Sequence, residues 1–368
     1  MPFVFVYFLQ TFTNILPRKP LQKYTFLIII NKVFLRSVHF RAAGNFIKKR
    51  KEESTMLIPV ILFILGLAII CIGGDKFVDN AVIVAKRLGM SEILVGATIV
   101  SIGTTLPEVL VSTTAALNGS ASICTGNAYG SIICNTALIA GISQLCRPSR
   151  GIDKKSFTWN VGLFFLFSIF LFAVQYFTGG VSRLTGIILL AGFVIYTIGY
   201  IRIAGSGSAE ASLQKQEEDD TPLPTALLML VFFAIALFIG ARLLVDNGTI
   251  IAENLGVPER VIAVTFIALG TSLPELVTTI TSLIKGYASL GLGNVLGANL
   301  LNLLLVIGIP STISGFAVDR QTTFIDVPVS MAVMLVLTVP FFVKKRGYRL
   351  QGLALLLIYA GYCVYSFL

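Results

Sequence analysis

Apolar stretches long enough to cross a lipid bilayer recur along this chain of 368 residues, and no other feature constrains its fold as strongly. A helix that spans about 30 Å of hydrocarbon needs about 20 predominantly apolar residues. Only 12% of the residues are charged, which is about half the share in soluble domains. The sequence therefore predicts an all-α polytopic membrane protein whose helices lie in the lipid bilayer.

The apolar stretches after Met56 predict ten transmembrane helices. They cover residues 57–74, 91–116, 123–144, 157–177, 184–204, 223–245, 258–283, 290–308, 325–343 and 351–368. A strongly polar stretch at 205–222 separates the fifth helix from the sixth and is predicted to be a flexible linker. We therefore expect two parts of five helices each, at residues 56–204 and 223–368.

The first 55 residues differ from the rest of the chain in charge. They hold ten Lys or Arg and two Glu residues, whereas the remainder is nearly balanced, with 18 basic and 16 acidic residues. Their apolar pieces are too short to span a bilayer. We expect Met56 to be the native start and 1–55 to be a mis-assigned extension, with a basic segment on the membrane surface as the alternative. The nearly neutral body gives no support to a nucleic-acid partner.

The basic residues after Met56 indicate how the helices are oriented. Most fall in one set of predicted loops, for example at Arg147, Lys285 and Arg346, and the positive-inside rule assigns these loops to the cytoplasm. With ten spans, the native N-terminus and the C-terminus then both lie outside the cytoplasm, and the linker 205–222 lies inside. The expected location is the cell (inner) membrane.

Two pairs of short motifs indicate that the two parts are related. GTTLPE at 103–108 matches GTSLPE at 270–275, and GNAYG at 126–130 matches GNVLG at 293–297, all with one offset of 167 residues. Because each part has an odd number of predicted helices, the second copy crosses the membrane in the opposite sense. Inverted repeats are typical of transporters that bind their substrate near the bilayer midplane.

Each copy of the first motif ends in a glutamate, Glu108 or Glu275. These are the only acidic residues that the sequence places deep within a predicted span, and no basic residue lies at a similar depth. An ionisable side chain there is costly and indicates function by default. Because no lysine or arginine is expected as a buried partner, a ligand must supply the positive charge.

Oxygen atoms are expected on both sides of each glutamate. Pro107 and Pro274 lack an amide hydrogen and are predicted to break their helices near 101–104 and 268–271, which frees backbone carbonyls. Carboxylate, carbonyl and hydroxyl oxygens are the ligands of hard cations such as Ca²⁺ and Na⁺. The five scattered cysteines and the single histidine offer no site for a softer metal, and no cofactor is expected. The candidate ligands are the side chains of Thr104, Thr105, Thr271 and Ser272 and the carbonyls of Ser101 and Ala268.

Positions four residues apart in the second pair of motifs share one face of a helix. They are Asn127, Ser131 and Asn135 and, in the second copy, Asn294, Ala298 and Asn302. For an isolated Asn, a hydrogen bond between helices is the ordinary role. With two glutamates nearby, we expect Asn135 and Asn302 to bind the cation, together with Ser131.

GTTLPE with GNAYGSIICN, and GTSLPE with GNVLGANLLN, resemble the two α-repeats of the Na⁺/Ca²⁺ exchanger family, in particular its compact prokaryotic members. The resemblance covers residues 56–368. It implies antiport of Ca²⁺ against Na⁺ by alternating access, with Glu108 and Glu275 as the central ligands of both ions. It also implies that Asn135 and Asn302 line the middle of the site, and that the first helix of each repeat slides across a rigid core.

The chain departs from the family pattern at three positions. Ala298 stands where the second repeat often has Ser, which removes a hydroxyl from a sodium site and leaves the transport stoichiometry open. Asn302 stands where some members carry Asp, so the site keeps two carboxylates, enough to neutralise one Ca²⁺. Ile132 replaces a common Asn and is expected to affect helix packing more than ion contact.

Other functions remain open on the sequence alone. The same two glutamates could exchange Ca²⁺ for H⁺, and K⁺ could be moved as well. A channel would carry ions without a counter-ion gradient, and a membrane scaffold would have no use for duplicated buried glutamates. An enzyme is not expected, because the sequence shows no nucleophile–base set, and no obligate protein partner is evident.

Overall fold

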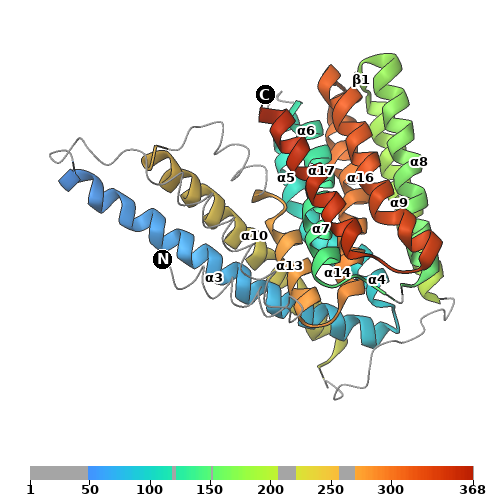
Figure 1. The fold of residues 1–368 in the computed structure, drawn as a ribbon, viewed down its shortest axis with the longest axis horizontal. Helices are drawn as coiled ribbons and strands as arrows, with labels where there is room; N and C mark the ends of the chain where they lie inside the picture. The colour runs from blue at the N-terminus through green and yellow to red at the C-terminus, as the bar shows by residue number, and fades with distance from the viewer. Residues whose placement is uncertain (1–48, 118–121, 151, 206–220, 257–269, 368) are drawn as a thin grey trace. The chain divides into compact units, whose positions relative to one another are not determined.

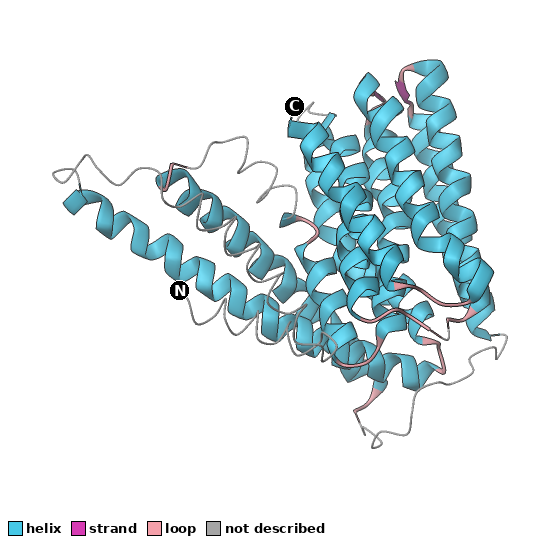
Figure 2. Cartoon of the chain, viewed as in Figure 1, coloured by secondary structure: helices cyan, strands magenta, loops and turns pink. Residues whose placement is uncertain are grey.

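The computed structural model describes residues 49–117, 122–150, 152–205, 221–256 and 270–367. These residues are almost entirely helical, and Figure 2 shows the one short pair of strands among them. Residues Met1–Pro59 form one unit and Val60–Leu368 form another. Most of the segment 1–55 lies outside the described residues, so its prediction stays untested. The first described helix begins at Lys49 and includes Met56.

The helices follow one another along the chain as labelled in Figure 1. The first half contains α3 (Lys49–Leu88), α4 (Glu92–Val95), α5 (Ser101–Leu117), α6 (Ser122–Ile133), α7 (Gly141–Cys146), α8 (Lys154–Thr178) and α9 (Arg183–Gly205). The second half contains α10 (Leu223–Asn254), α13 (Leu273–Ile284), α14 (Ala288–Leu301), α15 (Gly308–Ile313), α16 (Val327–Lys344) and α17 (Arg349–Phe367). Within the described residues, four π-helical segments interrupt these helices: η1 (Gly96–Val100), η2 (Cys134–Ala140), η4 (Asn302–Ile307) and η5 (Thr322–Asp326).

Eight helical stretches of the described chain are long and apolar enough to cross a membrane. They coincide with eight of the ten predicted spans. The span predicted at 258–283 is described only from residue 270, where α13 is a shorter apolar helix. The span predicted at 351–368 corresponds to α17, a helix of 19 residues. The structure therefore confirms a polytopic all-α architecture, and the count of ten spans stays a prediction.

The core of the larger unit lies around α14. All residues from Leu290 to Leu301 are buried, and the cluster around them includes side chains of α6, α8, α9 and α16. In contrast, only 22% of the most apolar stretch is buried in α3 and in α10, against 89% in the stretch that begins with α14. The helices α3 and α10 therefore lie at the edge of the bundle, with most of their apolar surface left for lipid.

Glycines allow two close helix crossings that organise this bundle. A Cβ atom at Gly66 of α3 would lie 2.8 Å from the carbonyl oxygen of Gly240 in α10. A Cβ atom at Gly96 in η1 would lie 2.2 Å from the carbonyl oxygen of Leu290 in α14. Backbones can approach this closely in a membrane only where small residues face each other. The first crossing joins α3 to α10, and the second seats the α4–η1–α5 stretch on α14.

Two short backbone pairings between loops show which helix ends lie together. The strand β1 (Gly180–Val181) follows α8 and pairs antiparallel with β2 (Phe316–Ala317), which follows α15. At the other end of α8, Arg150 forms an isolated β-bridge with Arg346, between α16 and α17. In each pairing, the positive-inside rule assigns the two joined loops to the same side of the membrane, and the two pairings lie on opposite sides.

The structure differs from the predicted proline break in the first motif helix and agrees with it in part in the second. α5 runs through Pro107 without a break, and the irregular turn is η1, which ends just before Ser101. A proline removes one hydrogen bond, and the buried packing of α5 holds that helix together without it. Pro274 lies in the first turn of α13, where its missing N–H leaves no hydrogen bond unmade. The chain forms a turn at Thr271–Ser272 directly before α13, at the end of the break expected at 268–271. Residues 257–269 lie outside the described chain, so the rest of that break stays untested.

Candidate ion-binding site

Two glutamates meet in the interior of the bundle. Glu108 lies on α5 and Glu275 in the first turn of α13, and neither side chain is exposed. Thr105, three residues before Glu108 on α5, donates a hydrogen bond to Glu275 Oε1 at 3.4 Å, which brings the two motif helices together at the glutamates. Both oxygens of Glu108, and Oε2 of Glu275, have no hydrogen-bond partner among the described residues. Burial of a carboxylate is unfavourable unless a positive charge or a proton compensates it.

Two asparagines tie the motifs of one half of the chain to those of the other. Asn294 Oδ1 accepts a hydrogen bond from Thr104 Oγ1 at 3.1 Å, and Asn127 Oδ1 accepts one from Thr271 Oγ1 at 3.4 Å. The two pairs are related by the offset of 167 residues: Thr271 corresponds to Thr104, and Asn127 corresponds to Asn294. The arrangement of the two motif pairs is therefore reciprocal, with each threonine facing the asparagine of the opposite half.

The amide nitrogens of the same asparagines bind within their own half. Asn127 Nδ2 donates to Ser112 Oγ at 2.9 Å and to the carbonyl oxygen of Glu108 at 3.1 Å. Asn294 Nδ2 donates to Thr278 Oγ1 at 2.9 Å. Each asparagine is thus fixed at both ends of its amide, which positions α5 and α13 against α6 and α14.

The hydroxyl groups beside the glutamates are not arranged symmetrically. Ser272 Oγ donates to Ser131 Oγ at 3.4 Å. The offset of 167 makes Thr105 and Ala298 the corresponding pair, and Ala298 has no hydroxyl. Thr105 Oγ1 instead donates to Glu275 Oε1 at 3.4 Å. One flank of the glutamate pair therefore carries two hydroxyls from side chains and the other carries one.

Two further asparagines are buried without partners. All side-chain nitrogen and oxygen atoms of Asn135 and Asn302 lack a hydrogen-bond partner among the described residues, and neither side chain is more than 1% exposed. Asn135 lies in η2, which packs on α13, and Asn302 begins η4, which packs on α5. The two π-helical segments are related by the offset of 167 to within one residue. Such segments are frequent at functional sites, and here each contacts a helix that carries a glutamate.

Comparison with known proteins agrees with this geometry. The model of the family described as sodium/calcium exchanger protein matches residues 58–202 and again residues 225–368. This chain belongs to the sodium/calcium exchanger family. As a member of it, the chain is a multi-pass membrane protein of the cation-antiporter class, and the named relatives are exchangers rather than enzymes. The resemblance inferred from the motifs is thereby confirmed.

Several relatives of this exchanger-family member align over most of its length. Inner membrane protein YrbG of Escherichia coli is 33% identical, over 76% of this chain and 88% of the relative. Sodium/calcium exchanger MaX1 of Methanosarcina acetivorans is 30% identical, over 83% of this chain and 98% of the relative. Among solved structures, the sodium-calcium exchanger NCX_Mj soaked with Na⁺ and Sr²⁺ superposes with a TM-score of 0.71 at 30% identity, covering 83% of this chain and 97% of that one.

The structure brings most of the predicted site residues of this family member together. Hydrogen bonds link Thr104, Thr105, Ser131, Thr271, Ser272 and Glu275 to the motif helices. Ser101 is buried, and its carbonyl oxygen accepts from Thr104 Oγ1 at 3.4 Å. Ala268 lies outside the described residues. Ser112 and Thr278, which the sequence reasoning missed, lie one helical turn after each glutamate and could have been found from that spacing.

A further buried acidic residue, Asp326, lies near the start of a span, which leaves standing the expectation that only Glu108 and Glu275 lie deep within one. Asp326 is 7% exposed and lies within the apolar stretch Thr322–Lys344. Its Oδ1 accepts a hydrogen bond from the hydroxyl of Tyr362 at 2.9 Å. The prediction began this span at residue 325, so Asp326 counted as a residue of the span edge. Because Asp326 has this partner, it differs from Glu108, which has none in the described part of the chain.

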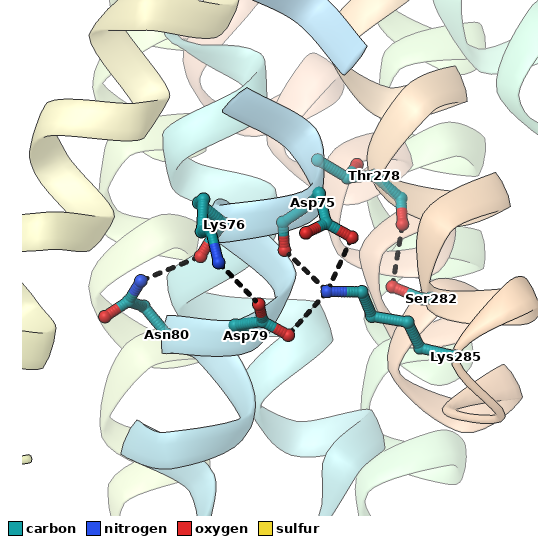
Figure 3. A network of polar contacts seen from close by, with 7 residues as sticks. All are labelled: Asp75, Lys76, Asp79, Asn80, Thr278, Ser282 and Lys285. Carbon is teal, nitrogen blue, oxygen red and sulfur yellow. Dashed lines mark hydrogen bonds and ion pairs between the residues drawn. The ribbon is translucent and has the colours of Figure 1, made fainter. Parts of the chain in front are cut away.

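A charged cluster also joins α3 to the loop after α13 (Figure 3). Lys285 Nζ lies 2.7 Å from Asp75 Oδ1 and 2.5 Å from Asp79 Oδ1, and it donates to the carbonyl oxygen of Asp75 at 3.0 Å. Partial burial lowers the pKa of Lys285, but the hydrogen bonds to the two aspartates outweigh it and raise that pKa above its ordinary value. The lysine is therefore charged. We call Lys285, Asp75 and Asp79 the Lys285 cluster.

Proposed function

We propose that this chain exchanges Ca²⁺ for Na⁺ across the membrane, with both ions using one site between α5 and α13. The observation that carries the proposal is the pair of buried glutamates whose oxygens lack hydrogen-bond partners among the described residues. Carboxylates with nearby amide and hydroxyl oxygens suit hard cations. The relatives MaX1 and NCX_Mj are both named as sodium–calcium exchangers, and the solved NCX_Mj was soaked with Na⁺ and Sr²⁺.

Charge balance explains how one site could serve both ions. Glu108 and Glu275 together neutralise one Ca²⁺ or two Na⁺. The neutral side chains of Asn135 and Asn302 add carbonyl oxygens but no charge, so they lower the cost of dehydrating an ion without favouring either valence. Because Ca²⁺ and Na⁺ draw on the same two carboxylates, they compete, and competition at a shared site is what antiport requires.

The reciprocal contacts of Thr104 with Asn294 and of Thr271 with Asn127 support an inverted repeat. In such a protein the site opens alternately to the two sides as one element moves against another. Under the orientation proposed from the positive-inside rule, the end of the bundle that holds Arg150 and Arg346 faces the cytoplasm.

The test is Ca²⁺ uptake by the full chain reconstituted in proteoliposomes. An outward Na⁺ gradient is expected to drive ⁴⁵Ca²⁺ uptake, and a gradient of pH alone is not. The second candidate, exchange of Ca²⁺ for H⁺, rests on the same unpartnered carboxylates, which protons would also neutralise. Uptake driven by pH and indifferent to Na⁺ would establish that candidate instead. Addition of K⁺ to the Na⁺-loaded vesicles shows whether K⁺ is also moved.

A further inference from the structure

The Lys285 cluster connects the peripheral helix α3 to the helix that carries Glu275. Lys285 follows the last residue of α13, and Asp75 and Asp79 lie one turn apart on α3 (Figure 3). The lysine side chain is 21% exposed, and the two aspartates are 48% and 40% exposed. The contact is thus partly shielded from water, and three oxygen atoms of α3 surround one ammonium group.

The segment of α3 beside this cluster covers the ion site. A Cβ atom at Gly74 would lie 2.4 Å from Val277 Cγ1, two residues after Glu275. Phe77 is 1% exposed, and its Cζ would lie 3.3 Å from a Cβ atom at Gly103, beside Thr104. Residues 74–79 of α3 therefore pack on both motif helices next to the proposed ligands.

The sequence provides the residues of such a cluster at only one of the two positions that the internal repeat relates. The offset of 167 places Arg242 and Asp246 at the positions of Asp75 and Asp79, and it places Asn118 at the position of Lys285. Two identical inverted halves would make the two open states equal in energy. A charged contact that exists at one of the two related positions and not at the other makes the two states unequal in energy and shifts their populations.

We propose that Lys285, Asp75 and Asp79 are positioning residues that hold α3, and with it Phe77, over the ion site, and so favour closure of the site at this end of the bundle. The inference rests on the alternating access of the proposed function. The new element is that the difference in population between the two open states arises from residues outside the ion site. Movement of α3 away from α13 has to separate Lys285 from both aspartates.

The test measures access to the α3–α13 contact without any ion gradient. Thr281, whose hydroxyl lies 3.7 Å from the Cβ position of Gly74, is replaced by Cys in a full-length chain whose five native cysteines are replaced by serine. A soluble maleimide then reports how often α3 leaves α13 in detergent. Lys285→Met is expected to speed modification about two- to fivefold, the range for one partly exposed ion pair.

Controls separate the cluster from general loss of structure. Lys76→Met, which removes a more exposed lysine of α3 that lies 3.8 Å from Asp79, should leave the rate unchanged. The exchange Asp79→Lys with Lys285→Asp should restore slow modification, which no merely unfolded variant would do. If Lys285→Met reacts at the rate of Lys76→Met, the proposal is wrong. A wild-type chain that shows no coupled uptake would instead overturn the proposed function and leave the rate measurement interpretable.

Discussion

Glu108 and Glu275 have three carboxylate oxygens without hydrogen-bond partners in the part of the chain that the structure describes. Glu108→Gln and Glu275→Gln each keep the shape of the side chain and remove its charge. We expect either change to weaken Ca²⁺ binding about 100-fold, because a charged interaction of about 3 kcal/mol is lost. The Tm without Ca²⁺ should not fall, since an uncompensated buried charge disappears. Calorimetric Ca²⁺ titration and thermal melts measure both, and near-normal binding in either variant would contradict a shared site.

Ala298 is the residue at which the two flanks of the site differ. Ala298→Ser adds one hydroxyl opposite Thr105, as Ser131 stands opposite Ser272. We expect Na⁺ to inhibit Ca²⁺ binding at a two- to tenfold lower concentration, since one added oxygen contact contributes about 0.5–1.5 kcal/mol. The matched change Ser131→Ala should shift the Na⁺ concentration in the opposite direction. Competition of Na⁺ with ⁴⁵Ca²⁺ on purified protein gives both inhibitory Na⁺ concentrations. An unchanged Na⁺ dependence in both variants would show that these hydroxyls do not contact Na⁺.

The sequence identified residues whose role depends on type and depth, and it missed roles that depend on pairing. Glu108 and Glu275 could be predicted because a carboxylate in an apolar stretch needs a reason of its own. Asn127 and Asn294 were on the expected face, but their reciprocal bonds to Thr271 and Thr104 depend on how two distant helices meet. Lys285 belonged to a loop by sequence, and nothing local indicated its contact with Asp75 and Asp79.

At the scale of helices, the seating of η1 on α14 positions Asn294 against Thr104. A Cβ atom at Gly96 would lie 2.2 Å from the carbonyl oxygen of Leu290 and 2.9 Å from the amide nitrogen of Asn294, and neither backbone atom can rotate away. Gly96→Ala is therefore expected to destabilise the protein by about 1–3 kcal/mol, the usual cost of overpacking. It should also weaken Ca²⁺ binding, because α14 has to shift together with Asn294.

Gly162 in α8 provides the matched control. A Cβ atom there meets nothing within 4 Å, so Gly162→Ala should be neutral or stabilising by up to about 1 kcal/mol from helix propensity. Thermal unfolding of both variants in the same detergent compares the two glycines. Equal melting temperatures for Gly96→Ala and Gly162→Ala would show that η1 and α14 pack less closely than their backbone contact implies.

The sequence located the motif helices but not all of their irregular turns. Proline predicted a break at 101–104, whereas the π-helical turn lies at η1 and α5 continues through Pro107. A lost hydrogen bond is a local event, and the surrounding packing decides whether the helix bends there. The turns η2 and η4 carry no proline or other local signal. They coincide with Asn135 and Asn302, where a helix has to present a buried polar group without a protein partner.

At the scale of the whole molecule, the two ends of α8 define two groups of loops. α8 has 25 residues, so its ends lie about 37 Å apart at 1.5 Å per residue, enough to cross the hydrocarbon layer. The pairing of Arg150 with Arg346 marks one end, and the pairing of β1 with β2 marks the other. Loops within a group must face the same side of the membrane, whichever side that is.

This grouping makes the proposed orientation testable with single cysteines. Lys154→Cys and Lys345→Cys represent the end with Arg150, and Ser182→Cys and Ala317→Cys represent the end with β1. In intact cells, a membrane-impermeant maleimide is expected to label Ser182→Cys and Ala317→Cys at least about tenfold faster, because the positive-inside rule leaves the basic end in the cytoplasm. Permeabilised cells should label all four.

A reversed pattern, with Lys154→Cys and Lys345→Cys labelled together, would keep the fold and invert the orientation. A mixed pattern within one group would contradict the loop pairing itself, since Arg150 and Arg346 could not then share an end. The orientation also decides on which side of the membrane the Lys285 cluster lies. Lys285 follows α13, and Gly286 beside it would place a Cβ atom 3.7 Å from Arg147 Nη1, so the cluster belongs to the group of Arg150. Labelling from outside at Ser182 therefore assigns the closure favoured by Lys285 to the cytoplasmic side, and the opposite result assigns it to the external side.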